Sequence, residues 1–368
     1  MAAHRPTKKH GRPDGPSKSM EPPMSSPKIS VKNLYKVFGS NPSQAIRLLD
    51  EGRSKDEIFA QTGQVVGINK VSFDVLAGEI YVLMGLSGSG KSTLIRLINR
   101  LVEPSCGSIN IDGLDIAALS QAELVKWRRK RVAMVFQSFA LMPHRNVLSN
   151  TALGLEMAGT PRQQREARAM EVLAQVGLQT YAAKYPAQLS GGMQQRVGLA
   201  RALAVDPDIL LMDEAFSALD PLKRVEMQSL LLDLQREQQR TVLFVSHDLE
   251  EALRIGNRIA IMEGGNLVQE GTAHQIITEP ANAYVRKFFE GVDTSRYLTA
   301  ADLLDPRLNG HSWDGGARLS WSTPLPEAMK IVLDRDQPIG VFDASDRLLG
   351  CISARSLLDR MSREARHV

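Results

Sequence analysis

The residues with the clearest chemistry form a glycine-rich run after an apolar segment. The run matches G-x-x-x-x-G-K-[ST] and consists of Gly85, Leu86, Ser87, Gly88, Ser89, Gly90, Lys91, Ser92 and Thr93. Its glycines allow backbone N–H groups to converge on phosphate oxygens, and the start of the following helix adds a favourable dipole. Lys91 is predicted to pair with the β and γ phosphates of a nucleotide, and the Ser92 hydroxyl to ligate Mg²⁺. Alone, this phosphate-binding loop (P-loop) leaves many possible enzymes.

Two carboxylates end a second apolar run, Ile209-Leu210-Leu211-Met212-Asp213-Glu214. A buried strand of this kind delivers Asp213 to the sheet edge where ligands of α/β proteins bind. Asp213 is predicted to hold the Mg²⁺ shell, and Glu214 to polarise or deprotonate an attacking water. The alternative is a pair of acidic residues that merely ends a strand.

A third motif, LSGGMQQR at residues 189–196, opens an evident helix between these two runs. Taken alone, Ser190, Gly191 and Gly192 could be no more than a serine helix cap followed by two glycines. The position of the motif between the P-loop and the carboxylate run favours a functional role.

The elements that must position these residues are apolar runs alternating with helical segments. Buried strands are predicted at Ile80–Met84, Val132–Phe136, Ile209–Met212, Thr241–Val245 and Arg258–Met262. Such runs are typical of an α/β fold with a largely parallel sheet covered on both faces. The polar stretch 40–64 favours helix and is predicted to be an insertion between two edge strands.

Charge and composition limit the remaining possibilities. The net charge of +4 belongs to residues 1–28, where six basic side chains face two acidic ones among six prolines. This pattern predicts a disordered tail. A weak membrane-surface contact is the alternative, and translation could start at Met20 or Met24.

The rest of the chain is balanced in charge, so no nucleic-acid partner is predicted. No apolar run or leader suits a membrane span or a secretory signal. Cys106 and Cys351 are expected as thiols in a reducing cytoplasm.

With these motifs in this order, the chain resembles the ABC ATPases, P-loop NTPases whose nucleotide-binding domain carries a helical subdomain. The resemblance implies ATP and Mg²⁺ as ligands. It implies Mg²⁺ ligation by Ser92, Gln137 and Asp213, and catalytic roles for Glu214, His247, Gln137 and Lys91. It also places Asp220, in Ser217–Asp220, at the dimer interface and Phe38 on adenine. For Phe38, simple core packing is a serious alternative.

In this family the Ser190–Gly192 segment contacts the nucleotide held by another subunit. The resemblance therefore implies a head-to-tail homodimer, or pairing with a partner of the same kind. Three long stretches around the motifs, and the insertion, resemble the ATP-binding subunits of bacterial glycine betaine/proline betaine importers. That implies a peripheral subunit on the cytoplasmic face of the inner membrane, transmembrane permease subunits and, indirectly, a substrate-binding protein. Phe139–Ser149 then suits a permease-docking groove, with core packing equally open.

The sequence leaves other interpretations open. Choline, proline or another small polar solute are alternative cargoes. A soluble ABC protein of DNA repair or translation lacks support, because such proteins usually carry two cassettes or a coiled-coil insertion. A regulatory module with a relic ATPase conflicts with the intact Lys91, Asp213, Glu214 and His247.

The predicted organisation has four parts: a disordered tail (1–28), an ABC nucleotide-binding domain (29–289), a linker (290–322) and a small α+β unit (323–368). The last part resembles a CBS motif, with a helix at Thr323–Asp334, strands at Ile339–Asp343 and Leu348–Ser353, and a helix at Ala354–Met361. CBS motifs usually come in pairs, and Ser356 stands where a ribose-binding Asp is common. Nucleotide sensing is therefore in doubt. Ion or lipid sensing, pairing of half-modules across the dimer and a structural remnant remain open.

Overall fold

The structure is a computed structural model that describes residues 26–290, 292–305, 308, 316–335 and 337–358. Most of the predicted tail 1–28 lies outside these residues. So does the end of the helix predicted at Ala354–Met361, of which residues 354–358 are helical.

A six-stranded sheet forms the centre of the larger part of the molecule. Its strand order is β10 (Asn266–Gly271), β9 (Arg258–Glu263), β3 (Ile80–Met84), β8 (Thr241–Ser246), β7 (Ile209–Asp213) and β6 (Val132–Val135). All neighbours are parallel except β10, which pairs antiparallel at one edge. Residues of β3, β7 and β8 are buried throughout, because packed layers cover both faces. The α/β fold with a largely parallel sheet is confirmed.

A second, antiparallel sheet contains β2 (Val65–Val75), β1 (Ile29–Phe38), β4 (Cys106–Ile111) and β5 (Leu114–Asp115), in that order. Its apolar residues share one core with α3 (Lys91–Ile98) and with Tyr81 and Leu83 of β3. The alternating residues Ile80 and Val82 of β3 belong to the core on the other face. This division follows from the two-residue period of a strand.

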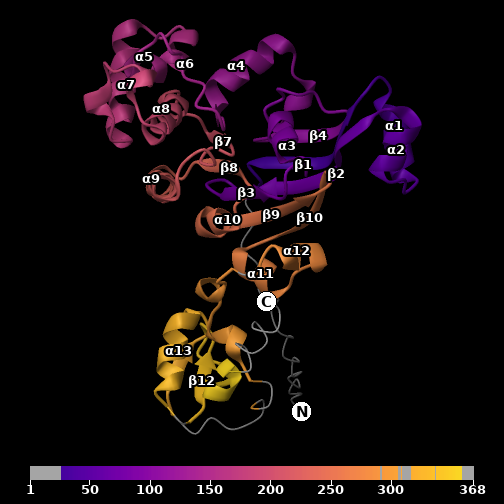
Figure 1. Ribbon diagram of the computed structural model, residues 1–368, viewed down its shortest axis with the longest axis vertical. Coiled ribbons are helices and arrows are strands. Elements are labelled where there is room, and N and C mark those ends of the chain that lie inside the picture. The colour runs from indigo at the N-terminus through magenta and orange to yellow at the C-terminus, as the bar shows by residue number, and fades with distance from the viewer. Residues whose placement is uncertain (1–25, 291, 306–307, 309–315, 336, 359–368) are drawn as a thin grey trace, which may run out of the picture.

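The insertion 40–64 forms α1 (Pro42–Asp50) and α2 (Lys55–Thr62), a helical pair at the end of the β1–β2 hairpin (Figure 1). Ser54 caps α2 in a capping box with Glu57. A small separate cluster of Val37, Ala45, Ile58 and Val66 fastens the pair to the hairpin. The prediction of two edge strands was wrong for β1, which hydrogen-bonds to both β2 and β4. The long-range pairing of β4 with β1 leaves no local pattern in the sequence.

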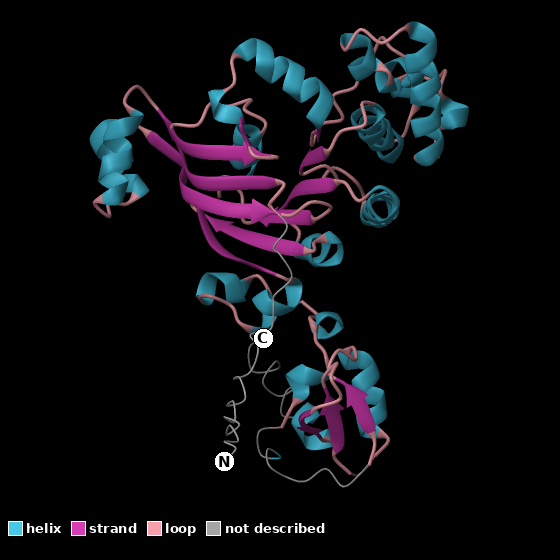
Figure 2. Ribbon diagram, turned by 180° about the vertical axis from the view of Figure 1, so that it is seen from behind, coloured by secondary structure: helices cyan, strands magenta, loops and turns pink. Residues whose placement is uncertain are grey.

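Helices gather in two places around the six-stranded sheet. The helical region that includes α5 (Val147–Thr151), α6 (Leu153–Met157), α7 (Arg162–Gln175) and α8 (Gly191–Ala204) extends away from the sheet (Figures 1 and 2). The helix α4 (Gln121–Arg131) instead packs beside the end of α3, where Arg128 donates to the Asn99 and Arg100 carbonyls. The helices α9 (Pro221–Gln238), α10 (Leu249–Ile255), α11 (Ala273–Thr278) and α12 (Ala283–Lys287) follow β7, β8 and β10. Within the described part of the chain, no helix combines the length and hydrophobicity needed to cross a membrane.

The C-terminal unit has its own three-stranded sheet of β11 (Arg318–Ser320), β12 (Ile339–Phe342) and β13 (Leu348–Ile352), with α13 at Leu325–Leu333. Its core includes Leu298, Leu303 and Leu319, all buried. The predicted linker, residues 290–322, is therefore too long. The 3₁₀ turns at Ser295–Tyr297 and Ala300–Leu303 and the strand β11 are folded structure, hidden by a composition rich in Gly, Asp and Ser.

Candidate functional site

The phosphate-binding loop joins the end of β3 to the start of α3, and its backbone requires glycine. Gly85 has φ +154°, and a Cβ there would lie 2.3 Å from the carbonyl oxygen of Met262. Gly90, with φ +104°, would place a Cβ 2.9 Å from the carbonyl oxygen of Gly67. Only glycine combines these conformations with such close backbone contact. The loop thus packs against β9 and β2, and this packing fixes the position of its N–H groups at the start of α3.

Lys91 lies inside this loop and is only 4% exposed. Its Nζ donates to the carbonyls of Gly85 at 2.7 Å and Leu86 at 2.9 Å. Burial lowers the pKa of the Lys91 ammonium, while the nearby carboxylates of Glu214 and Asp213 act to raise it. The Ser89 hydroxyl is buried and has no hydrogen-bond partner among the described residues. Phosphate oxygens fit this loop, because they would accept from both groups.

Oxygen ligands suited to Mg²⁺ meet at the end of β7. The Ser92 hydroxyl donates to Oδ1 of Asp213 at 2.8 Å, although 121 positions separate the two residues. Asp213 is 4% exposed, and its other oxygen lies 3.5 Å from the Arg96 guanidinium. Hydroxyl and carboxylate oxygens are the ligands that Mg²⁺ prefers. These two residues, predicted separately from two motifs, are brought together by the sheet.

Glu214 is the centre of a second contact group. Its Oε2 lies 3.4 Å from Nε2 of Gln137 and 3.3 Å from Nδ1 of His247. Its backbone has φ 48°, in the left-handed region, and its N–H donates to the Val245 carbonyl at 3.1 Å. Such conformations are costly for a residue with a side chain and occur often at functional sites. The ends of β6, β7 and β8 thus converge on one carboxylate.

The other predicted residues lie apart from this cluster. Ser190 caps α8, with its hydroxyl accepting from the Met193 N–H at 3.3 Å. Asp220 caps α9 by accepting from the Lys223 N–H at 3.1 Å. No hydrogen bond in the described part of the chain connects Ser190–Gly192 to the P-loop of the same chain. Ser190 and Asp220 therefore act as helix caps in this structure.

Phe38 ends β1 and is 43% exposed, which disfavours simple core packing. Its ring lies against Gly67, where a Cβ would come within 2.9 Å of it, and the Lys36 Nζ is 4.9 Å from its centroid. The exposed part of the Phe38 ring, next to β2, is therefore available for stacking.

Replacing Phe38 with alanine is expected to weaken ATP binding by about tenfold, because stacking of a base on an aromatic ring is lost. Phe38→Tyr keeps the ring and should bind like the parent protein. Titration with a fluorescent ATP analogue measures both variants. A lower melting temperature with unchanged affinity would instead indicate core packing.

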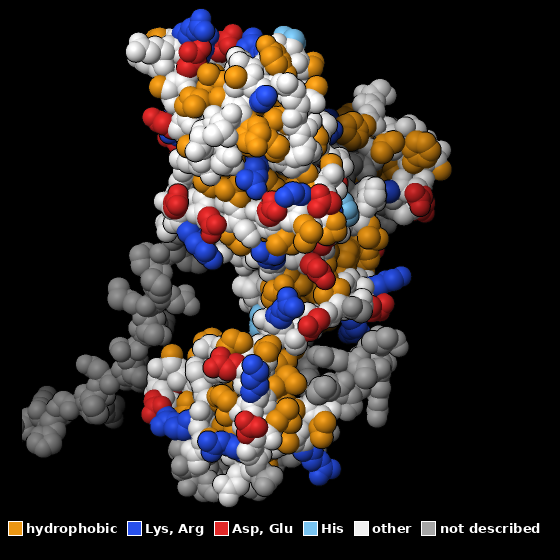
Figure 3. All heavy atoms as spheres, turned by 60° about the vertical axis from the view of Figure 1, so that its left-hand side comes forward, with side chains coloured by type: hydrophobic (Ala, Val, Ile, Leu, Met, Phe, Trp, Pro, Cys, Tyr) orange, Lys and Arg blue, Asp and Glu red, His pale blue; other side chains and the backbone are white. Residues whose placement is uncertain are grey.

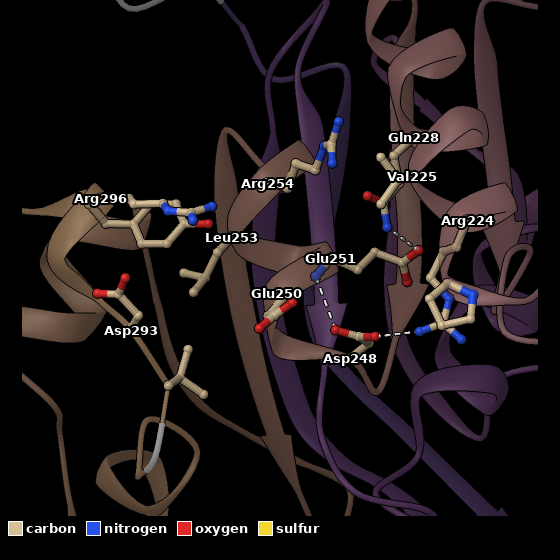
Figure 4. A pocket seen from close by; sticks show the side chains of 13 residues that line it. Arg224, Val225, Gln228, Asp248, Glu250, Glu251, Leu253, Arg254, Asp293 and Arg296 are labelled. Carbon is tan, nitrogen blue, oxygen red and sulfur yellow. Dashed lines mark hydrogen bonds and ion pairs between the residues drawn. The ribbon is translucent and has the colours of Figure 1, made fainter.

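Several residues that support the site were missed from the sequence. The Ser246 hydroxyl, next to His247, donates to the buried carboxylate of Glu251, and Gln228 donates to the same carboxylate at 3.2 Å. Arg224 pairs with Asp248 at 2.6 Å. Burial raises the pKa of Glu251. These contacts join α9 and α10 and hold the loop that carries His247, beside a cavity of about 460 Å³ (Figure 4). No motif marks them, since each is an ordinary polar residue at the end of a strand, at a helix cap or on a helix.

In the C-terminal unit, the hydroxyl of Ser356 is already engaged. It donates to the Ser353 carbonyl at 2.7 Å and accepts from the Ser353 N–H at 2.9 Å. These bonds lie at the first turn of the helical residues 354–358, which follow β13.

Comparison with known proteins identifies close relatives. The family described as "ABC transporter" matches residues 68–217. The glycine betaine/proline betaine transport system ATP-binding protein of Escherichia coli (strain K12) is 52% identical over 92% of this chain and 83% of its own length. The glycine betaine transport ATP-binding protein of Bacillus subtilis (strain 168) is 49% identical over 92% and 81%. A dimeric bacterial ABC transporter cassette superposes with TM-score 0.56 at 34% identity, covering 66% of this chain and 98% of that one.

Proposed function

Because this chain belongs to the ABC transporter family, among its ATP-binding subunits, we propose that it hydrolyses ATP to drive import of glycine betaine, proline betaine or a related methylated amine. The observation that carries this proposal is the match to the betaine-transport subunits over 92% of this chain. A trimethylamine N-oxide transport ATP-binding protein of Pelagibacter ubique (strain HTCC1062) is less similar, at 42% identity over 91% of this chain. A cargo with a methylated nitrogen is common to these names.

The positions of the site residues support the following roles. The P-loop amides and Lys91 would hold the phosphates of ATP, while Glu214 accepts a proton from, or orients, the attacking water. His247 and Gln137 contact Glu214 and would keep its carboxylate aimed at the γ-phosphate. Ser92, Asp213 and Gln137 would hold Mg²⁺, which when bound neutralises charge on the phosphates. The exposed ring of Phe38, at the end of β1, would stack on the adenine base.

We further propose that the active form is a head-to-tail homodimer. Each P-loop would be completed by Ser190–Gly192 and Asp220 of the partner chain. The side chains of Ser190 and Asp220 bond only to the starts of their own helices among the described residues, and the similar cassette is named as dimeric; both observations support this arrangement. An N-terminus such as that of α8 has N–H groups and a positive dipole end to offer a phosphate.

The partner on the membrane side is proposed to be a transmembrane permease that docks on the helical region. This region exposes several large apolar side chains, among them Met142, Met157, Met170, Tyr181 and Tyr185. Figure 3 shows apolar side chains exposed on the helical region, interspersed with charged ones. Exposed apolar side chains that gather on one region indicate an interaction surface. In Phe139–Ser149, Val147 is buried and Met142 is exposed, so the segment contributes to both core and surface.

Reconstitution tests the proposal directly. The chain is placed in proteoliposomes with the permease and the substrate-binding protein of its own transport system, and ATP hydrolysis is measured as solutes are added. Glycine betaine or proline betaine is expected to stimulate hydrolysis several-fold, more than choline, proline or trimethylamine N-oxide. If none of the methylated amines stimulates hydrolysis, the proposed cargo is contradicted. Hydrolysis that continues without stimulation would still support the ATPase assignment.

A further inference from the structure

The insertion α1–α2 places one cation close to the P-loop. Lys55 is the first residue of α2, and its Nζ donates to the Val66 carbonyl at 3.0 Å. Val66 belongs to β2, one residue before Gly67, the glycine covered by the Phe38 ring. The side chain therefore runs from the insertion to the strand beneath the proposed adenine site.

A short chain of backbone contacts continues from Lys55 to the phosphate-binding loop. A Cβ at Gly265, in the β9–β10 turn, would lie 2.4 Å from the Lys55 Nζ and 2.5 Å from the Gly67 carbonyl oxygen. The Gly265 N–H donates to the Ser89 carbonyl at 2.8 Å. A Cβ at Gly90 would lie 3.4 Å from the Cα of Gly265. One glycine thus separates the ammonium from the P-loop, and the absence of a side chain at 265 leaves room for it.

Lys55 is partly buried, and no carboxylate of the described residues pairs with it. The two acidic residues that follow it are placed elsewhere: Glu57 closes the capping box with Ser54 and lies near Arg53, and Asp56 is exposed. Burial lowers the pKa of the Lys55 ammonium. A partly desolvated cation bonded only to a carbonyl is unfavourable unless an anion compensates it. A polyphosphate on the neighbouring loop would be such an anion.

We propose that Lys55 is a nucleotide-affinity residue, whose positive charge attracts the phosphates of ATP bound at the P-loop and so makes the insertion part of the nucleotide site. This inference rests on the proposed ATP site. Charge attraction over such a separation depends on the number of phosphates and weakens with salt. A contact with the base or a purely structural bond would depend on neither.

The decisive variant is Lys55→Gln, because glutamine carries no charge and keeps an N–H donor on a side chain one atom shorter than that of lysine. Affinities of the full-length protein for ATP, ADP and AMP are measured by competition with a fluorescent nucleotide, at low and high salt. We expect Lys55→Gln to weaken ATP binding by about three- to tenfold at low salt, ADP less, and AMP hardly at all. The loss should shrink at high salt, and Lys55→Arg should bind like the parent.

Control variants distinguish a charge effect from a structural bond. Lys32→Met removes one exposed charge from β1 and should leave all three affinities unchanged. Equal losses for ATP, ADP and AMP, or parental affinity in Lys55→Gln, would overturn the proposal in favour of a structural bond. If Lys55→Gln folds poorly, judged by its melting temperature, Lys55→Met is measured in its place, and a loss that is larger for ATP than for AMP and shrinks at high salt still indicates a charge effect. Lys91→Ala should abolish binding in every case, and its failure to do so would refute the ATP site itself.

Discussion

Replacing Glu214 with glutamine is expected to lower ATP hydrolysis by about a hundred- to ten-thousandfold, the usual contribution of a positioned general base. Glutamine has nearly the same shape and can still contact Gln137 and His247, so the site should keep its geometry. It cannot accept a proton from water. ATP should therefore bind normally and remain unhydrolysed, and the closed dimer should accumulate. Phosphate release and size-exclusion chromatography with ATP measure the two effects.

The matched control is Glu237→Gln, which neutralises an exposed carboxylate on α9 with the same change of charge. It should hydrolyse ATP at the parental rate and form no trapped dimer. Parental turnover in Glu214→Gln would remove Glu214 from the catalytic role. A loss of turnover together with a loss of ATP binding would indicate damage to the P-loop, which the contacts of Glu214 do not predict.

Two inactive chains are expected to restore each other when mixed. Gly191→Asp places a carboxylate where the partner's γ-phosphate is expected, and should abolish hydrolysis. The chain itself should fold, because a Cβ at Gly191 meets only the ring of Phe139, at 3.6 Å, and an acidic residue suits the first turn of a helix. The Glu214→Gln chain fails in its own P-loop site but keeps an intact Ser190–Gly192. A mixed dimer therefore has one complete site.

The two proteins are mixed in equal amounts before ATP is added, so that protomers can exchange. Half of the dimers should then be mixed, each with one live site, and hydrolysis should reach up to about a quarter of the parental rate in a symmetric two-site dimer. The Gly191→Asp protein alone, at the same total concentration, serves as the control, because neither site of its dimer is complete. No recovery in the mixture, with dimers present, would contradict a site shared between chains.

Much of this molecule can be predicted from local patterns. The apolar run Ile80–Met84 predicts a strand with the same bounds as β3, because strands buried on both faces have uninterrupted apolar sequences. The P-loop is recognisable because glycines at fixed spacing serve one backbone geometry. The C-terminal unit is harder to predict. Leu298, Leu303 and Leu319 form part of its core, yet they are scattered through a polar stretch that gives no periodic signal.

Support for the site could not be predicted, because it depends on distant residues. Arg224 with Asp248, and Ser246 with Glu251, hold the loop of His247 through contacts between α9, α10 and β8. Each pair consists of residue types that are usually solvated on helix surfaces, so the sequence offers no reason to single them out. Lys55 belongs to the same class, since only the fold brings it to Gly265.

By itself the sequence determined the order of motifs that marks the family, and it predicted which groups carry the chemistry: the glycines and Lys91 of the P-loop and the carboxylates Asp213 and Glu214 at the end of β7. These are local properties, because a phosphate-binding loop and a buried strand end are encoded by adjacent residues. Only the tertiary structure decided that Ser92 meets Asp213, that Gln137 and His247 meet Glu214, and that Ser190 does not meet its own P-loop. The physical reason is that parallel strands distant in sequence end at one edge, where side chains within hydrogen-bond reach act as one site.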